Sequence, residues 1–221
     1  MKLARPDIRH PAIVLTGSPR GDDAGLIAAL RKRGLHSRWL SWDDPDTLHA
    51  DLVMLRTATD YADRLDEFLA WTRRVPNLLN TPDVVAWNAG KHYLRDLRDA
   101  GVTVRASASG RATALVYLGG VQSHAFTAQQ PVDADLELWD VGQAALRAAA
   151  DQLSIGADEL LYARADVTED AELARLDLVA PSLGWTLLDD AARQDAQRRF
   201  ALSVESALER LGLGPLSHRR P

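Results

Sequence analysis

Residues 51–61 read DLVMLRTATDY, and this stretch decides the fold expected for the chain. Its first part, Leu52 to Leu55, is a short apolar run typical of a buried parallel strand. Arg56 and Asp60 follow directly, and open α/β sheets bind ligands beyond the carboxyl ends of their strands. Arg56 is therefore a candidate to hold a carboxylate or phosphate with its guanidinium group. The alternative is an Arg56–Asp60 ion pair that stiffens the loop.

The rest of the first half alternates short apolar runs with helical patterns. An apolar run at residues 12–15 ends at the turn residues 16–19. A helical stripe then runs to Gly34, and residues 65–72 form a second helical face. Alternating strands and helices predict an α/β fold whose N-terminal lobe has a parallel sheet.

The second half has a different pattern. Two strand-like runs at 114–118 and 121–128 are joined by Gly119-Gly120, which is a hairpin signal. An Ala-rich helix over 134–153, a second hairpin over 160–179 and a closing amphipathic helix follow. We therefore expect a lobe of antiparallel strands with packed helices, and a division of the chain into residues 1–104 and 105–221.

The composition limits the classes of function. The chain has 221 residues, a net charge of −5 and no cysteine. The charge argues against a nucleic-acid partner bound by bulk electrostatics, and the lack of cysteine excludes disulfides and thiolate metal sites. No apolar run has the length of a membrane span or a signal core, so no membrane partner is expected and the predicted location is cytoplasmic.

The basic residues are mostly arginine. Arg dominance together with abundant Ala, Asp and Leu is typical of a bacterial protein from a high-GC genome. No lysine follows Lys91 in the sequence, so any site that needs a lysine from the later chain cannot form.

A second candidate site lies in residues 87–94, which read WNAGKHYL. Asn88 is predicted to be a helix N-cap, with Lys91 in the first turn that follows. A cation is disfavoured at a helix N-terminus unless it faces an anion that the helix end also binds. Lys91 is thus a candidate for binding an anion at the helix end that Asn88 caps, and the alternative is a solvated surface lysine.

A third candidate lies in the last predicted hairpin. The period of two places Tyr162, Arg164 and Asp166 on one face of the first strand. With near-symmetric register about the turn, Asp166 lies close to Arg175 and Asp177 of the partner strand. Two carboxylates alone would suggest a Mg²⁺ site. The arginine between them favours charge neutralisation within the protein, so Arg175 stands against the metal site at Asp166 and Asp177.

Three further polar positions are given structural roles. His124 lies in a predicted strand far in sequence from any complete catalytic triad, so it is interpreted as a structural histidine. The aspartate pairs at 43–44 and 189–190 are interpreted as loop and helix-capping carboxylates.

Together these segments resemble bacterial ATP-grasp ligases of the type of O-ureido-serine cyclo-ligase, RimK and glutathione synthetase. The resemblance spans nearly the whole chain with one large gap. The matching stretches are residues 51–61, 67–71, 79–82, 85–94, 100–102, 123–125, 161–166, 176–183 and 199–201.

The resemblance implies a reaction and roles for the candidate residues. In the family, ATP phosphorylates a carboxylate and an amine displaces the phosphate, while Mg²⁺ and basic side chains neutralise the moving phosphoryl group. It implies that Arg56 and Asp60 lie near the substrate, Lys91 and Asn88 near the nucleotide, and Asp166 and Asp177 at the metal.

Several family features are missing from this sequence. After Val102 the family continues into a subdomain with a second phosphate-binding lysine and a glycine-rich flap, and here only residues 105–110 precede the next strand. The family's Glu-Arg-Ser stands as Ala-Thr-Ala at 112–114, and its basic pair as Thr-Ala at 127–128. Its first metal-bridging glutamate falls on Arg175, which reverses the local charge.

These departures predict a degenerate ATP-grasp-like protein that does not catalyse ligation, needs no cofactor, and binds a small carboxylate, an amino-acid-like ligand or a protein partner. One alternative is an active carboxylate–amine (cyclo-)ligase with a minimal site for ATP and Mg²⁺, completed by a second subunit of a homo-oligomer. Another is a structural subunit that pairs with a full-length family member.

Overall fold

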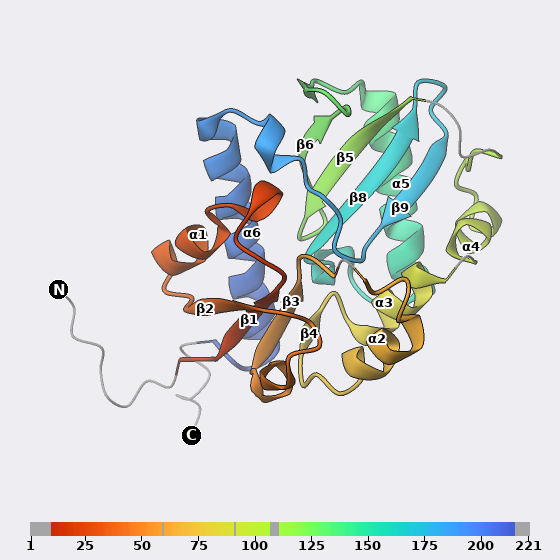
Figure 1. The fold of residues 1–221 in the computed structure, drawn as a ribbon. Helices are drawn as coiled ribbons and strands as arrows, with labels where there is room; N and C mark the ends of the chain where they lie inside the picture. The colour runs from red at the N-terminus through yellow and green to blue at the C-terminus, as the bar shows by residue number, and fades with distance from the viewer. Residues whose placement is uncertain (1–9, 59, 91, 107–110, 215–221) are drawn as a thin grey trace.

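The computed structural model describes residues 10–58, 60–90, 92–106 and 111–214. Its described strands form a parallel sheet in the order β2-β1-β3-β4 and an antiparallel sheet in the order β7-β6-β5-β8-β9. Figure 1 shows these sheets in two adjoining lobes, with α5 behind the antiparallel sheet and α6 alongside both lobes. The α/β fold class and the two kinds of sheet predicted from the sequence are confirmed.

The first lobe has short parallel strands covered by helices on both faces. Its strands pair in parallel throughout. The elements are β1 (Ile13–Thr16), η1 (Gly21–Asp23), α1 (Leu26–Lys32), β2 (Ser37–Leu40), η2 (Pro45–His49), β3 (Leu52–Leu55), α2 (Leu65–Thr72), β4 (Leu78–Leu79), α3 (Pro82–Ala89) and α4 (Tyr93–Asp99).

The second lobe has the two predicted hairpins and the two predicted helices. Gly119 and Gly120 both have positive φ, 56° and 76°, as a tight turn between twisted strands requires. The elements are β5 (Ala112–Leu118), β6 (Val121–Phe126), β7 (Pro131–Val132), α5 (Leu136–Gln152), η3 (Ala157–Glu159), β8 (Tyr162–Thr168), β9 (Leu173–Asp177), η4 (Trp185–Leu187) and α6 (Asp190–Arg210).

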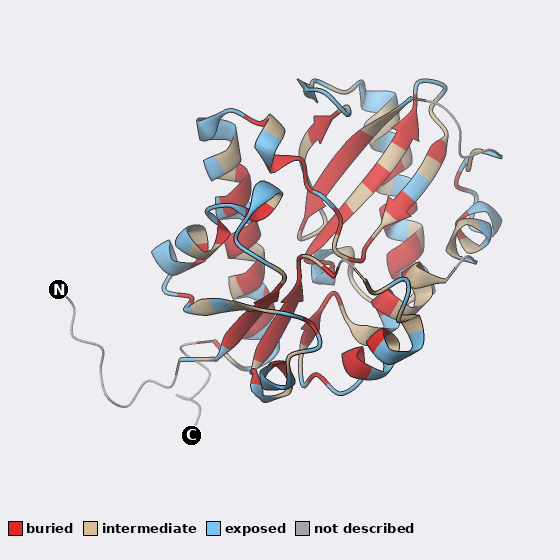
Figure 2. Ribbon diagram, in the orientation of Figure 1, coloured by how far each residue is buried: buried red, intermediate tan, exposed pale blue. Residues whose placement is uncertain are grey.

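The hydrophobic core continues from one lobe into the other. Ile13, Leu15 and Met54 on one face of the first sheet belong to the same buried cluster as Phe200 and Val204 of α6. That cluster also contains residues of β5 and β8, so α6 packs against both sheets. Figure 2 shows this buried layer running along the inner side of α6 and through both sheets. A second cluster joins residues of α3 and α4 to the face of the second sheet that α5 covers. Both clusters therefore contain residues from either side of position 104.

Two buried asparagines join the first lobe to the edge of the second sheet. Asn80 accepts a hydrogen bond from Leu161 N at 2.8 Å and donates to Leu178 O at 3.0 Å. Asn88 accepts from Leu178 N at 2.7 Å and donates to Leu176 O at 3.0 Å. The side-chain amides thus satisfy buried backbone groups at the start of β8 and at the end of β9.

Among the described residues, no helix is both long and apolar enough to cross a lipid bilayer.

Candidate functional site

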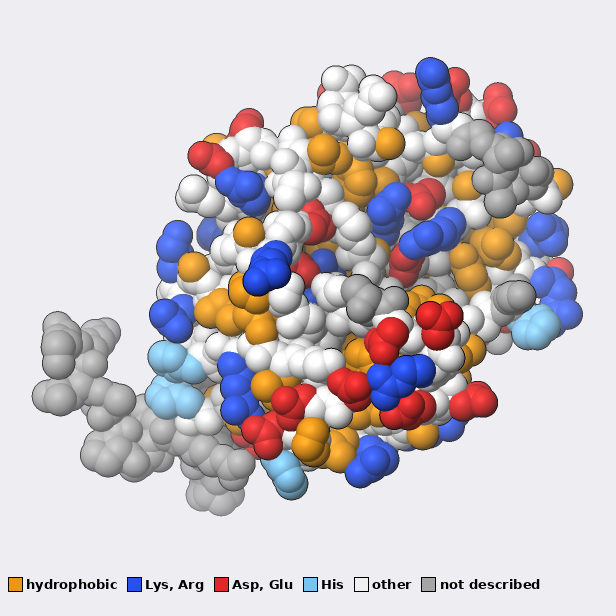
Figure 3. All heavy atoms as spheres, in the orientation of Figure 1, with side chains coloured by type: hydrophobic (Ala, Val, Ile, Leu, Met, Phe, Trp, Pro, Cys, Tyr) orange, Lys and Arg blue, Asp and Glu red, His pale blue; other side chains and the backbone are white. Residues whose placement is uncertain are grey.

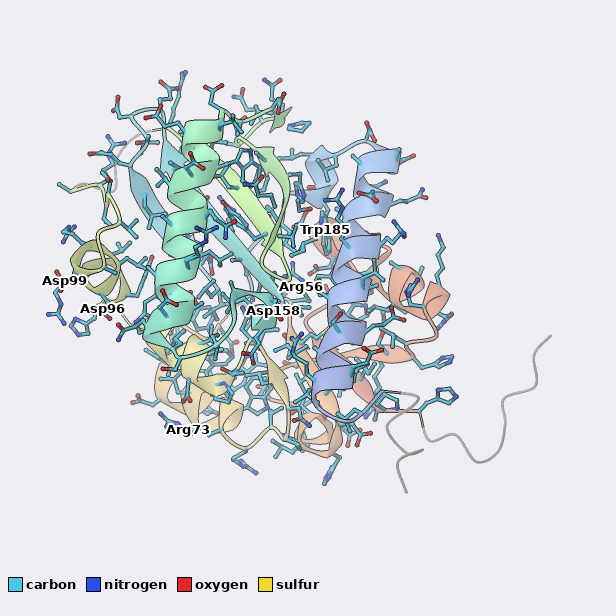
Figure 4. The ribbon with its side chains drawn as sticks, turned by 180° about the vertical axis from the view of Figure 1, so that it is seen from behind. Arg56, Arg73, Asp96, Asp99, Asp158 and Trp185 are labelled. Carbon is cyan, nitrogen blue, oxygen red and sulfur yellow. The ribbon has the colours of Figure 1, made fainter. Side chains whose placement is uncertain are left out.

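Arg56 lies at the carboxyl end of β3, as predicted, but its side chain is turned into the protein. The residue is 3% exposed, and its Nε donates to Asp23 Oδ1 at 2.9 Å. Nη2 donates to Pro181 O at 3.1 Å, and the guanidinium lies over the rings of Tyr162 and Trp185. Figure 4 shows Arg56 and Trp185 in the layer between α6 and the second sheet. The alternative ion pair with Asp60 is wrong, because the partner of Arg56 is Asp23.

The Arg56–Asp23 pair is a buried ion pair within the first lobe, and Arg56 also contacts Pro181, Tyr162 and Trp185 of the second lobe. Burial raises the pKa of Asp23, and the Arg56 guanidinium opposes that rise. Among the described residues, Nη1 of Arg56 has no hydrogen-bond partner. With its charge committed to Asp23 and its side chain inside the core, Arg56 is placed to stabilise the interface between the lobes. This geometry does not support the substrate contact predicted for it.

Asp60 lies on the surface of the first lobe in a separate network. Its carboxylate accepts from Trp42 Nε1 at 2.8 Å and from Arg64 at 2.9 Å. The hydrogen bond from Trp42, followed by that from Arg64, lowers the pKa of Asp60. Arg64 also binds Asp43 and Glu67, so one guanidinium serves three carboxylates. Asp60 therefore does not share a site with Arg56.

Asn88 is not a helix N-cap. It lies in the last turn of α3, and the residue that caps α4 is His92. The N-cap prediction is wrong because Asn88 belongs to the preceding helix, which ends at Ala89. Gly90 then has an extended backbone, and the next helix begins only at Tyr93. The Asn88 carboxamide is buried and engaged at both ends by the backbone of β9 and the residue after it. Lys91 lies outside the described residues, so its nucleotide contact stays a prediction.

The predicted cluster on the last hairpin is present. Arg164 lies opposite Asp177, and Asp166 lies opposite Arg175, so all four share one face of β8 and β9. Arg164 Nε donates to Asp166 Oδ1 at 2.7 Å, and Arg175 Nη2 donates to Asp177. We call these four residues the arginine–aspartate strip. In Figure 3, basic and acidic side chains lie side by side over β8 and β9.

Within the strip, the guanidinium of Arg175 is the most accessible charge. The Arg175 side chain is 54% exposed, compared with 13% for Asp177 and 14% for Asp166. Burial lowers the pKa of Arg175, but the nearby carboxylates, Asp177 first and then Asp166, raise it on balance. The carboxylates are thus less exposed than Arg175, and the strip presents mainly the N–H donors of Arg175 to the outside.

Two tyrosines from the first lobe lie within electrostatic range of the strip. Burial raises the pKa of Tyr61, and the negative charge of Asp177 raises it further. Burial also raises the pKa of Tyr93, which has a hydrogen bond with the backbone of Leu176 and interacts with Arg175. The strip is therefore bordered by phenol groups from the loop after β3 and from the start of α4.

The arginine–aspartate strip does not suit Mg²⁺. Mg²⁺ needs carboxylate, phosphate or water oxygens in octahedral geometry, and here each strip carboxylate accepts a hydrogen bond from an arginine. Over the described ranges there is no group of three or more His, Asp or Glu side chains that could hold a metal ion. The predicted neutralisation by Arg175 matches its pairing with Asp177, while Asp166 is paired with Arg164.

The loop after β9 is fixed by the side chains of Asp22 and His124, of which Asp22 is not among the residues predicted to have a role. The Asp22 carboxylate accepts from Leu183 N at 2.6 Å, Gly184 N at 3.0 Å and Thr186 N at 3.1 Å. His124 Nε2 lies 2.6 Å from Leu183 O, which supports the structural interpretation of this histidine. The only signal for Asp22 in the sequence is its place after the turn residues that end the first strand.

Two surface hollows lie away from the strip. One of about 600 Å³ lies between α1 and α6 and is lined by residues such as Ala28, Lys32 and Arg198. Another of about 500 Å³ lies at the far end of the second sheet, beside Arg111, Thr113, Thr127 and Glu169. Neither contains a residue predicted to bind substrate or metal.

The fold is that of the ATP-grasp ligases. A crystal structure of D-cycloserine synthetase DcsG superposes with a TM-score of 0.73 at 21% identity, covering 90% of this chain and 99% of that chain. D-alanine–D-alanine ligase from Bacillus anthracis, complexed with ATP, gives a TM-score of 0.61 at 11% identity, covering 92% and 98%. The ATP-grasp ligase PsnB, complexed with a precursor variant, Mg and ADP, gives 0.57 at 13% identity, covering 90% and 100%.

At the level of sequence, the first lobe carries the similarity. Residues 10–80 match the family model of the D-cycloserine synthetase DcsG N-terminal domain. No curated protein matches the chain in a sequence search.

Proposed function

We propose that this chain is a non-catalytic protein with the ATP-grasp fold that binds a small carboxylate, such as an amino-acid-like molecule, without consuming ATP. The observation that carries the proposal is the pairing of both candidate metal carboxylates with arginines on the same strand face. Phosphoryl transfer depends on cations placed around the moving group, and these carboxylates are occupied by the protein's own cations.

The scarcity of other basic side chains for neutralising phosphate also argues against ligation. No lysine follows Lys91 in the sequence, and residues 112–114 and 127–128 carry no charged side chain. A nucleotide site in the second lobe would have to neutralise several phosphate charges without a lysine from this lobe. This favours a binding function over ligation.

The expected test result is no Mg²⁺-dependent release of phosphate from ATP with any pair of amino acids. Release of phosphate that disappears in Lys91→Ala would contradict the proposal. Calorimetric titration with ATP provides a second measurement, because micromolar binding would favour an active ligase with a minimal nucleotide site. The similarity in fold to DcsG and D-alanine–D-alanine ligase is what supports that alternative.

The ligand part of the proposal has a separate test. A thermal-shift screen of amino acids, dipeptides and dicarboxylates is expected to find at least one compound that raises Tm, because a ligand that binds only the folded state stabilises it. A screen in which no carboxylate raises Tm would contradict carboxylate binding, whatever the result with ATP.

A further inference from the structure

We propose that the arginine–aspartate strip is an oxyanion site in which Arg175 supplies the positive charge, so that a carboxylate or phosphate group binds without a divalent metal ion. This inference rests on the proposed function, because it assigns the proposed ligand to this face of the second sheet. It adds which side chains bind the ligand and through which chemical groups.

The first step is the arrangement of the two guanidiniums. Arg164 and Arg175 are diagonal neighbours, because Arg164 lies opposite Asp177 and Arg175 lies opposite Asp166. Diagonal positions on an antiparallel pair are about 7–8 Å apart, within reach of long side chains. Both guanidiniums can therefore approach one small anion above the strands.

The second step is the anchoring of these guanidiniums. Asp177 binds Arg175, and it also accepts a hydrogen bond from Val179 N at 3.1 Å. Asp166 binds Arg164, whose guanidinium lies over the ring of Phe126 at 5.1 Å. An arginine fixed in this way loses less conformational entropy when it binds a ligand.

The third step is the kind of group that the strip exposes. The Asp177 and Asp166 side chains are 13% and 14% exposed, while the Arg175 side chain is 54% exposed. One guanidinium has five N–H donors, and Asp177 does not use all of them. Tyr61 and Tyr93 border the strip, and burial raises the pKa of both phenols further above neutral pH, so they remain O–H donors. N–H and O–H donors without exposed acceptors match an oxyanion and not a metal ion.

The experiment is calorimetric titration of the full chain with inorganic phosphate and, separately, with succinate, each in the presence of EDTA and then of Mg²⁺. The expected result is binding of at least one probe with the same Kd in both conditions. Which probe binds tells whether the site takes a phosphate or a carboxylate group. Binding that requires Mg²⁺, or binding of neither probe in EDTA, would overturn the proposal.

Variants localise the binding. Arg175→Gln is expected to raise the Kd of the probe at least ten-fold, because it removes the accessible positive charge. The position is half-exposed, so the variant should still fold. Arg147→Gln, on the exposed side of α5 behind the sheet, is the matched control and is expected to leave Kd unchanged. Equal Kd values in the wild type and Arg175→Gln would overturn this proposal and leave carboxylate binding elsewhere intact.

A charge reversal provides an independent measurement. Arg175→Glu would place three carboxylates at 166, 175 and 177 on neighbouring strands, which is a donor set for a divalent cation. We expect this variant, and not the wild type, to bind Mn²⁺ when titrated by electron paramagnetic resonance. Equal Mn²⁺ binding by both proteins would contradict the assignment of Arg175 as the resident cation.

Discussion

At the scale of single residues, the charge of Arg56 serves the interface between the lobes. The guanidinium is enclosed by Asp23, Pro181 O and the rings of Tyr162 and Trp185. Arg56→Met would leave the Asp23 carboxylate buried without its partner. Because an uncompensated buried charge costs about 3–5 kcal/mol, the free energy of unfolding in urea should fall by that order.

The double variant Asp23→Asn/Arg56→Met provides the control. It removes both charges, so we expect it to be more stable than Arg56→Met alone. A loss below about 1 kcal/mol in the single variant would show that the pair is not the main contact between these loops.

His124 predicts a dependence of stability on pH. Burial lowers the pKa of His124 below its ordinary value, although Leu183 O and Asp22 oppose the shift. Protonation is therefore easier in the unfolded chain, and stability falls as the pH decreases through about 6.5 toward the folded pKa.

The variant His124→Gln keeps an N–H donor for Leu183 O and cannot titrate. Between about pH 7.5 and pH 5 we expect the wild type to lose more stability than this variant in urea titrations. Parallel pH curves for the two proteins would exclude His124 as a source of the pH dependence.

At the scale of elements, β9 depends on side chains for the pairing of its outer edge. The Asn88 carboxamide donates to Leu176 O and accepts from Leu178 N, while Leu173 at the other end of β9 bonds the backbone of Thr103 and Arg105. Asn88→Ala leaves two buried backbone groups without partners, at about 1–3 kcal/mol each. We expect a large loss of stability and faster hydrogen exchange at the Leu178 amide.

Asn77 offers a matched comparison, because its side chain makes a single bond to Asp51 O in a half-buried position. Asn77→Ala should cost clearly less than Asn88→Ala in the same denaturant titration. Equal losses would mean that Asn88 is not needed to satisfy the edge of β9.

The elements also show how far the sequence alone leads. Strong patterns predicted β3, α2, α5 and both hairpins, because buried apolar runs and the Gly119-Gly120 turn leave few alternatives. The strand β2 was not predicted, since Ser37–Leu40 is a half-exposed edge with no continuous apolar run.

The candidate site was predicted less completely, because its contacts depend on tertiary structure. The period of two in the hairpin gave the shared face of Arg164, Asp166, Arg175 and Asp177. The Asp23 partner of Arg56 lies 33 positions away in the sequence, and no local spacing indicates it. The bonds of Asn88 to residues 176 and 178 are likewise invisible before the lobes are assembled.

At the scale of the whole molecule, the shared core predicts one cooperative unfolding transition. Phe200 and Val204 of α6 pack with Ile13 and Leu15 of the first sheet and with strands of the second. Circular dichroism and tryptophan fluorescence should therefore give the same midpoint in urea. Two separate transitions would show that the lobes unfold independently.

The same packing predicts the behaviour of a fragment. Residues 1–104 contain the parallel sheet but lack α6, which covers one of its faces. We expect this fragment to remain largely unfolded or to aggregate, as measured by circular dichroism and size-exclusion chromatography. A monomeric fragment with native strand content would contradict this.

The return of α6 to the first sheet also bears on how the protein forms in the cell. The parallel strands leave the ribosome early, and the helix that shields Ile13, Leu15 and Met54 follows only after the whole antiparallel sheet has been translated. During that interval an apolar sheet surface is open to other nascent chains. We therefore expect the first lobe to be prone to aggregation until α6 has been translated and packs on it.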